Sequence, residues 1–303
     1  MWHRMTLPSK EISYICFLSF ADSRMSLATS RIEKQAQRMN MFDKIYVWNE
    51  YDLDDEFREK WKHVLLPSVR GFGYWIWKPW AILKVLETMP EGGILLYMDA
   101  GSHLNRMAKN YLLKHFSALL DDDLGVKAFP ISLIKPKRCL ESRWTKGDVF
   151  DYFSCRDMEY VVQTPQMEAN TILIRKSEKV VDFIKDWYKV FEDNFSLVDD
   201  SVSSSPNMAD FERGLHDQSV FSVLFKLRGG KAFPQGGTLP YIMTNPVWAL
   251  RDRGGERKSF AERIKLICKN YTKYFVFKFR SVGSSLLFIK DAITNLLVKS
   301  RDK

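Results

Sequence analysis

An aspartate that directly follows an apolar run is the first residue of this sequence that could do chemistry. Residues 93–98 have the composition of a buried strand, and Asp99 comes next, within the run Tyr-Met-Asp-Ala-Gly-Ser. Ligands of open α/β sheets bind beyond the carboxyl ends of the strands, which is where Asp99 is expected. A carboxylate there can hold a ribose hydroxyl or a divalent cation that bridges a diphosphate. Alternatively, Asp99 only caps the turn that follows.

A second cluster combines aromatic rings with one cation. Residues 71–80 read Gly-Phe-Gly-Tyr-Trp-Ile-Trp-Lys-Pro-Trp, and the two glycines permit a close backbone approach. A solvated loop this apolar would be a liability, so it either packs in the core or covers a ligand. In the second case Lys78 would neutralise phosphate while Trp75 or Trp77 stacks on a base. In the first case at least one Trp fastens the following helix to the sheet.

Two polar runs later in the chain add carboxylates and amides. Glu168 and Asn170 stand ahead of an apolar run, at the predicted mouth of the sheet. His216, Asp217 and Gln218 begin a predicted helix, where an Asp is a common cap. In the mouth of the sheet, the same three residues could instead provide a general base, a metal ligand and a partner for sugar hydroxyls.

Apolar and amphipathic runs alternate along the chain. Strands are predicted at residues 12–20, 44–48, 93–98, 126–134, 169–174 and 231–233. Helices are predicted at residues 26–39, 52–63, 80–89, 111–120, 177–191 and 217–227. The Ser-rich residues 199–207 predict a mobile loop, residues 71–79 a second loop, and residues 135–163 show no clear period. The alternation predicts an α/β fold.

The net charge divides the chain in two. Residues 251–303 hold 14 Lys and Arg against five Asp and Glu, which accounts for all of the +9 of the 303-residue chain. We therefore predict a main domain at 1–250 and a basic amphipathic helical tail at 251–303, which either lies on an anionic membrane surface or packs on the main domain. The four scattered cysteines suit a reducing compartment, and neither a signal peptide nor a membrane span is visible.

The order of these clusters along residues 11–240 resembles that of GT-A fold glycosyltransferases from bacterial capsule and lipopolysaccharide clusters, relatives of the family 8 galactosyl- and glucosyltransferases. The resemblance implies a Rossmann-like mixed sheet flanked by helices. It also implies a nucleotide-sugar donor, with a UDP-sugar favoured, and a surface-polysaccharide or lipid-linked glycan acceptor. The expected location is the cytoplasm, on the inner face of the cytoplasmic membrane.

The resemblance also implies roles for individual residues. Asp217 would be the general base of an inverting reaction, whereas in a retaining reaction Glu168 or Asp217 would face the sugar. Asp99 matches the first residue of an Asp-x-Asp motif that holds Mn²⁺ or Mg²⁺, but the second position is Gly101, and this departure puts metal use in question. The residues expected to bind substrate are Trp75, Trp77, Lys78, Asp99, Ala100, Asn170, His216 and Gln218.

Two other classes of protein fit parts of the sequence. A nucleotidyltransferase should have a Gly-rich phosphate loop after the first strand, but residues 21–24 are Ala-Asp-Ser-Arg. A non-catalytic binder of carbohydrate or nucleic acid would use the aromatic residues and the positive charge. Nucleic acid is not an expected partner, because the first 250 residues are neutral overall.

Overall fold

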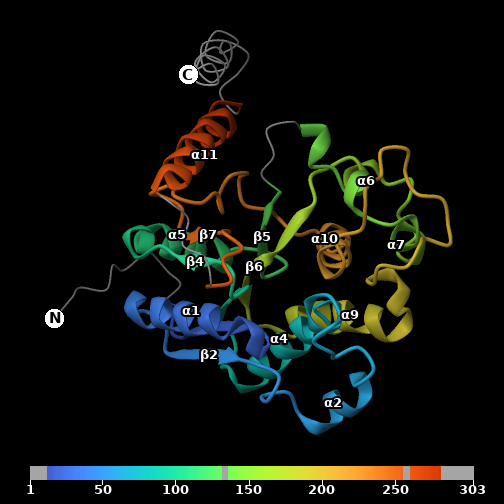
Figure 1. Cartoon of the computed structure of the whole chain (residues 1–303), viewed down its shortest axis with the longest axis horizontal. Coiled ribbons are helices and arrows are strands. Elements are labelled where there is room, and N and C mark those ends of the chain that lie inside the picture. The colour runs from blue at the N-terminus through green and yellow to red at the C-terminus, as the bar shows by residue number, and fades with distance from the viewer. Residues whose placement is uncertain (1–11, 132–135, 255–259, 281–303) are drawn as a thin grey trace.

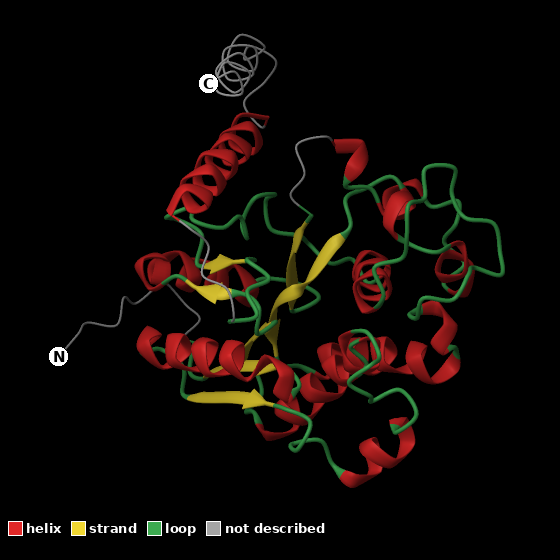
Figure 2. Cartoon of the chain, viewed as in Figure 1, coloured by secondary structure: helices red, strands yellow, loops and turns green. Residues whose placement is uncertain are grey.

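The computed structural model describes residues 12–131, 136–254 and 260–280. Its centre is a sheet in the order β2-β1-β3-β6-β5, with a separate pair formed by β4 and β7 (Figures 1 and 2). The strands are β1 (Ile15–Phe20), β2 (Lys44–Trp48), β3 (Ile94–Met98), β4 (His103–Leu104), β5 (Val126–Pro130), β6 (Met167–Arg175) and β7 (Val247–Trp248). β1 is parallel to both neighbours, whereas β6 is antiparallel to β3 and β5. The predicted mixed α/β sheet is confirmed.

Helices cover both faces of this sheet. They are α1 (Ser26–Met39), α2 (Asp55–Trp61), α3 (Gly71–Tyr74), α4 (Trp77–Thr88), α5 (Lys109–Leu120), α6 (Glu141–Trp144), α7 (Gly147–Tyr152), α8 (Glu159–Val162), α9 (Glu178–Asp193), α10 (Asp217–Leu227) and α11 (Phe260–Arg280). The side chains of α1 and α5 form one core with the sheet, and those of α4, α9 and α10 form the other. Figure 1 labels these five helices.

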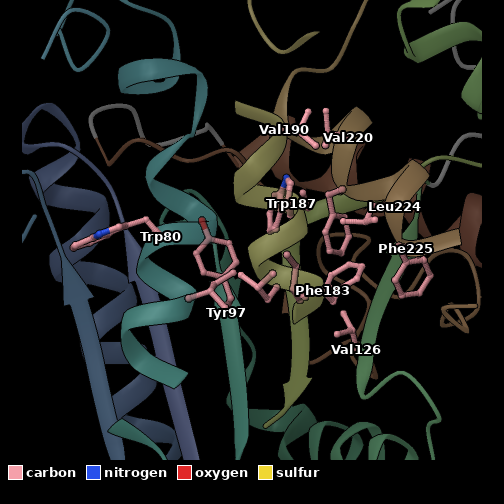
Figure 3. Close-up of a cluster of buried hydrophobic side chains, with 14 of the residues drawn as sticks. Trp80, Tyr97, Val126, Phe183, Trp187, Val190, Val220, Leu224 and Phe225 are labelled. Carbon is pink, nitrogen blue, oxygen red and sulfur yellow. The ribbon is translucent and has the colours of Figure 1, made fainter. Parts of the chain in front are cut away.

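The two cores follow from the two-residue period of the strands. In β3, Leu95 and Tyr97 belong to the core of α4, α9 and α10, whereas Leu96 belongs to the core of α1 and α5. Figure 3 shows Phe183 and Trp187 of α9 within the core of α4, α9 and α10. Burial of each such side chain contributes roughly 1.5–3 kcal/mol, so this core holds the carboxyl end of β3 firmly in place.

Most predicted elements lie where expected, and four expectations need correction, the last of which concerns residues 199–207. No strand forms at residues 231–233 of the described chain, where one hydrogen bond joins the Phe233 amide to the Ala128 carbonyl oxygen at 2.9 Å. Residues 71–79, predicted as a loop, contain the turn α3 and the start of α4. Residues 135–163 contain α6, α7 and α8, each too short to show a helical period.

The Ser-rich residues 199–207 are fastened to α7 and its flanks. Asp148 accepts hydrogen bonds from the amides of Ser204 and Ser205, at 2.9 and 2.7 Å. Asn207 Oδ1 accepts from the Gly147 amide at 2.7 Å, and Arg156 donates to the Pro206 carbonyl oxygen. These contacts hold the segment in a defined path, in contrast to the predicted mobile loop.

The basic tail contains a helix, α11, that packs on the body of the protein. Tyr271 and Tyr274 of α11 pack against Leu239 and Ile242, and Asn270 donates to the Pro240 carbonyl oxygen at 3.1 Å. The predicted second half of the tail, at 284–299, lies outside the described residues. Within the described part of the chain, no helix has the length and apolarity that crossing a membrane requires.

Candidate functional site

Two carboxylates and one buried ammonium meet at the carboxyl end of β3. Lys78 Nζ lies 2.6 Å from Asp217 Oδ2, 3.3 Å from Asp99 Oδ1 and 3.2 Å from the Ala169 carbonyl oxygen. The 2.6 Å contact is an ion pair that lacks the angles of a regular hydrogen bond. Asp99 follows β3, Asp217 begins α10, and Lys78 is the second residue of α4. Helix packing therefore unites residues that are far apart in the sequence.

The position of Lys78 gives it a role other than the predicted neutralisation of phosphate. Its side chain is 3% exposed, and three protein oxygens surround an ammonium that has three N–H donors. Burial opposes the charge of Lys78, but Asp217 and Asp99 together raise its pKa. The ammonium thus compensates the charge of two neighbouring carboxylates.

The two carboxylates differ in access to solvent. The Asp99 side chain is 33% exposed, and its Oδ1 accepts a hydrogen bond from Tyr97 at 2.7 Å. Asp217 is 6% exposed at its side chain, and burial raises its pKa to about 6, although Lys78 works in the opposite direction. Asp99 is therefore the member of the cluster that a ligand can reach most easily.

An irregularity in the pairing of β6 with β5 lies next to this site. Ala128 of β5 pairs with Ile172, but the next residue, Phe129, pairs with Glu168, so residues 169–171 have no partner in β5. On its other side β6 stays in register, since Met98 pairs with Thr171 and the Asn170 carbonyl oxygen accepts from the Asp99 amide at 2.9 Å. Bulges often re-aim groups next to active sites, and this one lies where β6 meets the turn that carries Asp99.

Gln218 supports the bulge. Its Oε1 accepts from the Ala169 amide at 3.2 Å, and its Nε2 donates to Gln166 Oε1 at 2.7 Å. Gln166 is fully buried and donates to Thr145 and Ser219. Both ends of the Gln218 amide are engaged within the protein, so the structure gives it a positioning role and not the predicted contact with substrate.

Glu168 is a second partly buried carboxyl at this edge. Burial raises its pKa to about 7, against the influence of hydrogen bonds from Thr238 and Asn170. Thr238 Oγ1 donates to Glu168 Oε2 at 2.8 Å, and Asn170 Nδ2 lies 3.4 Å from the same oxygen. A carboxyl with a pKa near neutrality can exchange a proton with a ligand at physiological pH. The side-chain amide nitrogen of Asn170 is therefore a hydrogen-bond partner of Glu168.

A strained segment borders Asp217. Residues 71–75 all have positive φ, and three of them, Phe72, Tyr74 and Trp75, are not glycine. The rings of Tyr74 and Trp75 lie 5.3 and 5.5 Å from that of His216, which also has a positive φ of 56°. Such backbone conformations cost about 1–3 kcal/mol each and cluster at functional sites. Asp217 follows His216 directly.

The surroundings of His216 favour its neutral form. Burial lowers its pKa, and Nδ1 lies 2.8 Å from the Val198 carbonyl oxygen, to which it donates. Its Nε2 is then an acceptor and lies 3.4 Å from Arg70 Nη1. His216 thus ties the start of α10 to residue 198 and to Arg70.

The two tryptophans predicted to bind substrate, Trp75 and Trp77, differ in burial. Trp77 is 4% exposed, stacks on Phe20 with ring centroids 4.2 Å apart, and donates to the Gly71 carbonyl oxygen. Its predicted contact with substrate is therefore replaced by a role in the core. Trp75 is partly exposed, and its ring lies over Gly71, where an added Cβ would meet it at 2.5 Å.

The donor set around Asp99 does not fit a divalent metal ion. The cationic Lys78 is 3.3 Å from Asp99 Oδ1, and the second position of the predicted motif is Gly101. Within residues 12–131, 136–254 and 260–280, no group of three or more acidic, His or Cys side chains is arranged to bind a metal. Ala100 is buried, and its carbonyl oxygen accepts from Arg31 at 2.8 Å.

Several residues of this region have roles that the sequence did not predict. Tyr97, Gln166 and Thr238 hold site residues through hydrogen bonds described above. A less expected neighbour is Arg251, which the sequence places in the basic tail, because its backbone packs on Gly101. Only the run of small residues after Asp99 hinted that another segment approaches there.

No protein-family profile matches the chain, and no curated protein sequence matches it. Among solved structures, the chain resembles a glycosyltransferase involved in the glycosylation of the major capsid of PBCV-1, with 14% identity, a TM-score of 0.45 and coverage of 84% of this chain and 98% of that chain. The galactosyltransferase LgtC is 12% identical with a TM-score of 0.35, covering 80% of this chain and 84% of that one.

Another similar structure is 4-diphosphocytidyl-2C-methyl-D-erythritol synthase from Anaerococcus prevotii, at 10% identity, a TM-score of 0.34 and coverage of 84% and 95%. The solved structures that the chain resembles thus include glycosyltransferases, as the order of its motifs predicts, among other enzymes. We therefore base the function on the residues of this chain.

Proposed function

We propose that this chain is a nucleotide-sugar-dependent glycosyltransferase. The observation that supports this most directly is the cluster in which Lys78 compensates Asp99 and Asp217 at the carboxyl end of β3. The partly exposed Asp99 would bind a hydroxyl of the donor, on the ribose or on the sugar. Open α/β sheets bind nucleotides at this edge, which agrees with the location of Asp99.

The reaction needs a proton acceptor, and Glu168 has the properties of one. The acceptor hydroxyl oxygen forms a bond to the anomeric carbon of the donor, while the bond from that carbon to the diphosphate breaks and its electron pair leaves with the diphosphate. The hydroxyl proton passes to Glu168, whose pKa of about 7 suits this transfer, and later to water. Asp217 would face the positive charge that develops on the sugar.

The donor, the acceptor and the location belong to the same proposal. We favour a UDP-sugar as donor and a surface-polysaccharide or lipid-linked glycan as acceptor, reached on the inner face of the cytoplasmic membrane. Exposed Ile264 and Phe275 lie eleven residues apart on α11, and therefore on the same side of the helix. Lys265 and Lys269 are exposed on the same helix, a combination that suits an anionic lipid surface.

Ligand-dependent thermal stability tests the proposed function. A ligand that binds only the folded protein raises its melting temperature, by an amount that grows with concentration above Kd. UDP-, GDP-, CMP- and dTDP-sugars would be compared with free nucleoside triphosphates, each in EDTA and in Mn²⁺. We expect one class of nucleotide sugar to stabilise the protein. Stabilisation by a triphosphate alone would instead indicate a nucleotidyltransferase, and no shift with any compound would contradict nucleotide binding.

A further inference from the structure

The turn that follows Asp99 is covered by a segment from the start of the basic tail. A Cβ added at Gly101 would lie 3.3 Å from the Cα atom of Arg251, and the Asp252 amide donates to the Gly101 carbonyl oxygen at 2.9 Å. A contact of this length is tighter than most side chains tolerate. The absence of a side chain at 101 therefore lets the backbone of residues 251–252 occupy the space beside Asp99.

This segment is held firmly by polar contacts. Arg31 donates to the carbonyl oxygens of Ala100 and Asp252, at 2.8 and 3.0 Å, and so joins the turn after Asp99 to the segment at 251–252. The Asp252 carboxylate contacts Arg31 at 3.2 Å and His103 Nε2 at 2.9 Å. Arg251 itself has a positive φ of 53°, an unfavourable conformation that the contacts of its neighbours maintain. We therefore assign residues 251–254 to the main domain and not to the tail.

The side chain of Arg251 remains available. It is exposed, and its guanidinium has no hydrogen bond or ion pair with the residues that the structure describes. It also lies close enough to Glu168 for its charge to lower the pKa of that carboxyl, although burial keeps the pKa raised. The backbone of Arg251 thus lies against the turn that follows Asp99, and its side chain adds positive charge in the neighbourhood of Glu168.

The proposed reaction needs such a cation. The diphosphate of the donor is already anionic and gains one more negative charge as it leaves, whereas the ammonium of Lys78 is already surrounded by protein oxygens. Electrostatic stabilisation of this kind is usually the largest single catalytic contribution. We propose that Arg251 binds the diphosphate of the donor at the place beside Asp99 where a second carboxylate and its metal ion would otherwise stand. This inference rests on the proposed function and adds that donor binding requires no divalent metal.

A guanidinium suits this role because its planar fork matches two phosphate oxygens and its charge does not titrate near neutrality. A lysine at the same position would provide charge without the two-point geometry. Arg251→Gln should therefore weaken diphosphate binding strongly, and Arg251→Lys less. Arg228 provides a matched control, because it is exposed at the far end of α10 and pairs with Asp186.

The test measures binding of UDP, GDP, CDP and dTDP, and of the matching monophosphates, by calorimetry in EDTA. We expect one diphosphate to bind wild-type protein in EDTA with no gain from Mn²⁺. R251Q should weaken it by about tenfold or more, an effect that is larger than for the monophosphate, while R228Q binds like wild type. Melting temperatures of the variants establish that each is folded.

The outcomes separate this inference from the proposed function. A diphosphate that binds wild type and R251Q equally, or that binds only with Mn²⁺, would overturn the role of Arg251 and leave the glycosyltransferase proposal in place. If none of the four diphosphates binds wild-type protein in either condition, both proposals are wrong.

Discussion

Replacing Lys78 by Met would test whether its ammonium compensates the two carboxylates. Met is close in length, so the change removes charge with little loss of volume. Asp217 is 6% exposed and would lose the cation 2.6 Å away. Removing one partner of a buried ion pair costs about 3–5 kcal/mol because the other charge is left buried. For a chain of 303 residues that corresponds to a fall in melting temperature of roughly 5–8 °C.

The pH dependence of this loss has a definite sign. Burial already raises the pKa of Asp217 to about 6, and removing Lys78 would raise it further. A carboxyl whose pKa is higher in the folded than in the unfolded state destabilises the fold as pH rises through the interval between the two values. Melting curves of K78M and wild type should therefore differ most near pH 8 and approach each other near pH 5.

A second variant separates stability from activity. In K78M/D217N the buried carboxylate is gone, so most of the lost stability should return, whereas donor turnover should stay at least about a hundredfold below wild type. Differential scanning calorimetry and release of nucleoside diphosphate would be measured on the same samples. Equal stability of K78M and wild type at pH 8 would refute the compensation argument.

Three further predictions concern other parts of the site. In wild type, kcat should fall below about pH 7, where Glu168 becomes protonated and cannot accept a proton. Glu168→Gln should remove this fall, and a pH profile of the variant that still falls below about pH 7 would assign the fall to another group. Trp77→Ala should cost about 3–5 kcal/mol in urea unfolding, whereas Trp75→Ala should cost clearly less, and the reverse order would contradict the packing described here. Charge reversal at Lys265 and Lys269 should abolish cosedimentation with vesicles of anionic lipid while leaving donor hydrolysis in solution unchanged, and unaltered cosedimentation would argue against α11 as the contact.

The sequence predicts long periodic elements better than short ones. The ranges 26–39, 44–48 and 217–227 coincide with α1, β2 and α10, because apolar periodicity over such lengths reflects packing against one sheet. Helices of four to six residues, such as α6 and α8, carry no period. The antiparallel direction of β6 also leaves no trace in composition, because strand direction depends on connections made elsewhere in the chain.

The sequence predicts the location of the candidate site better than it predicts the contacts between its side chains. Strand ends and a helix start suggested that Asp99 and Asp217 would meet, and the structure brings both to Lys78. Sequence alone does not show that the Lys78 ammonium is buried and shared between them, because this depends on how α4 packs. The approach of Arg251 to Gly101 is a contact between distant parts of the chain that no local pattern encodes.

The most direct test of the account is the release of nucleoside diphosphate from nucleotide sugars by wild type and Asp99→Ala. Asp99 is one-third exposed, so the variant should stay folded. It should lose some stability, because the Tyr97 hydroxyl loses the carboxylate to which it donates. Reaction products would be separated by chromatography after incubation with each donor, at matched fractions of folded protein. We predict release by wild type with one class of donor and a fall of at least about a hundredfold in D99A. Release at the wild-type rate by folded D99A would contradict the assignment of this cluster as the reaction site.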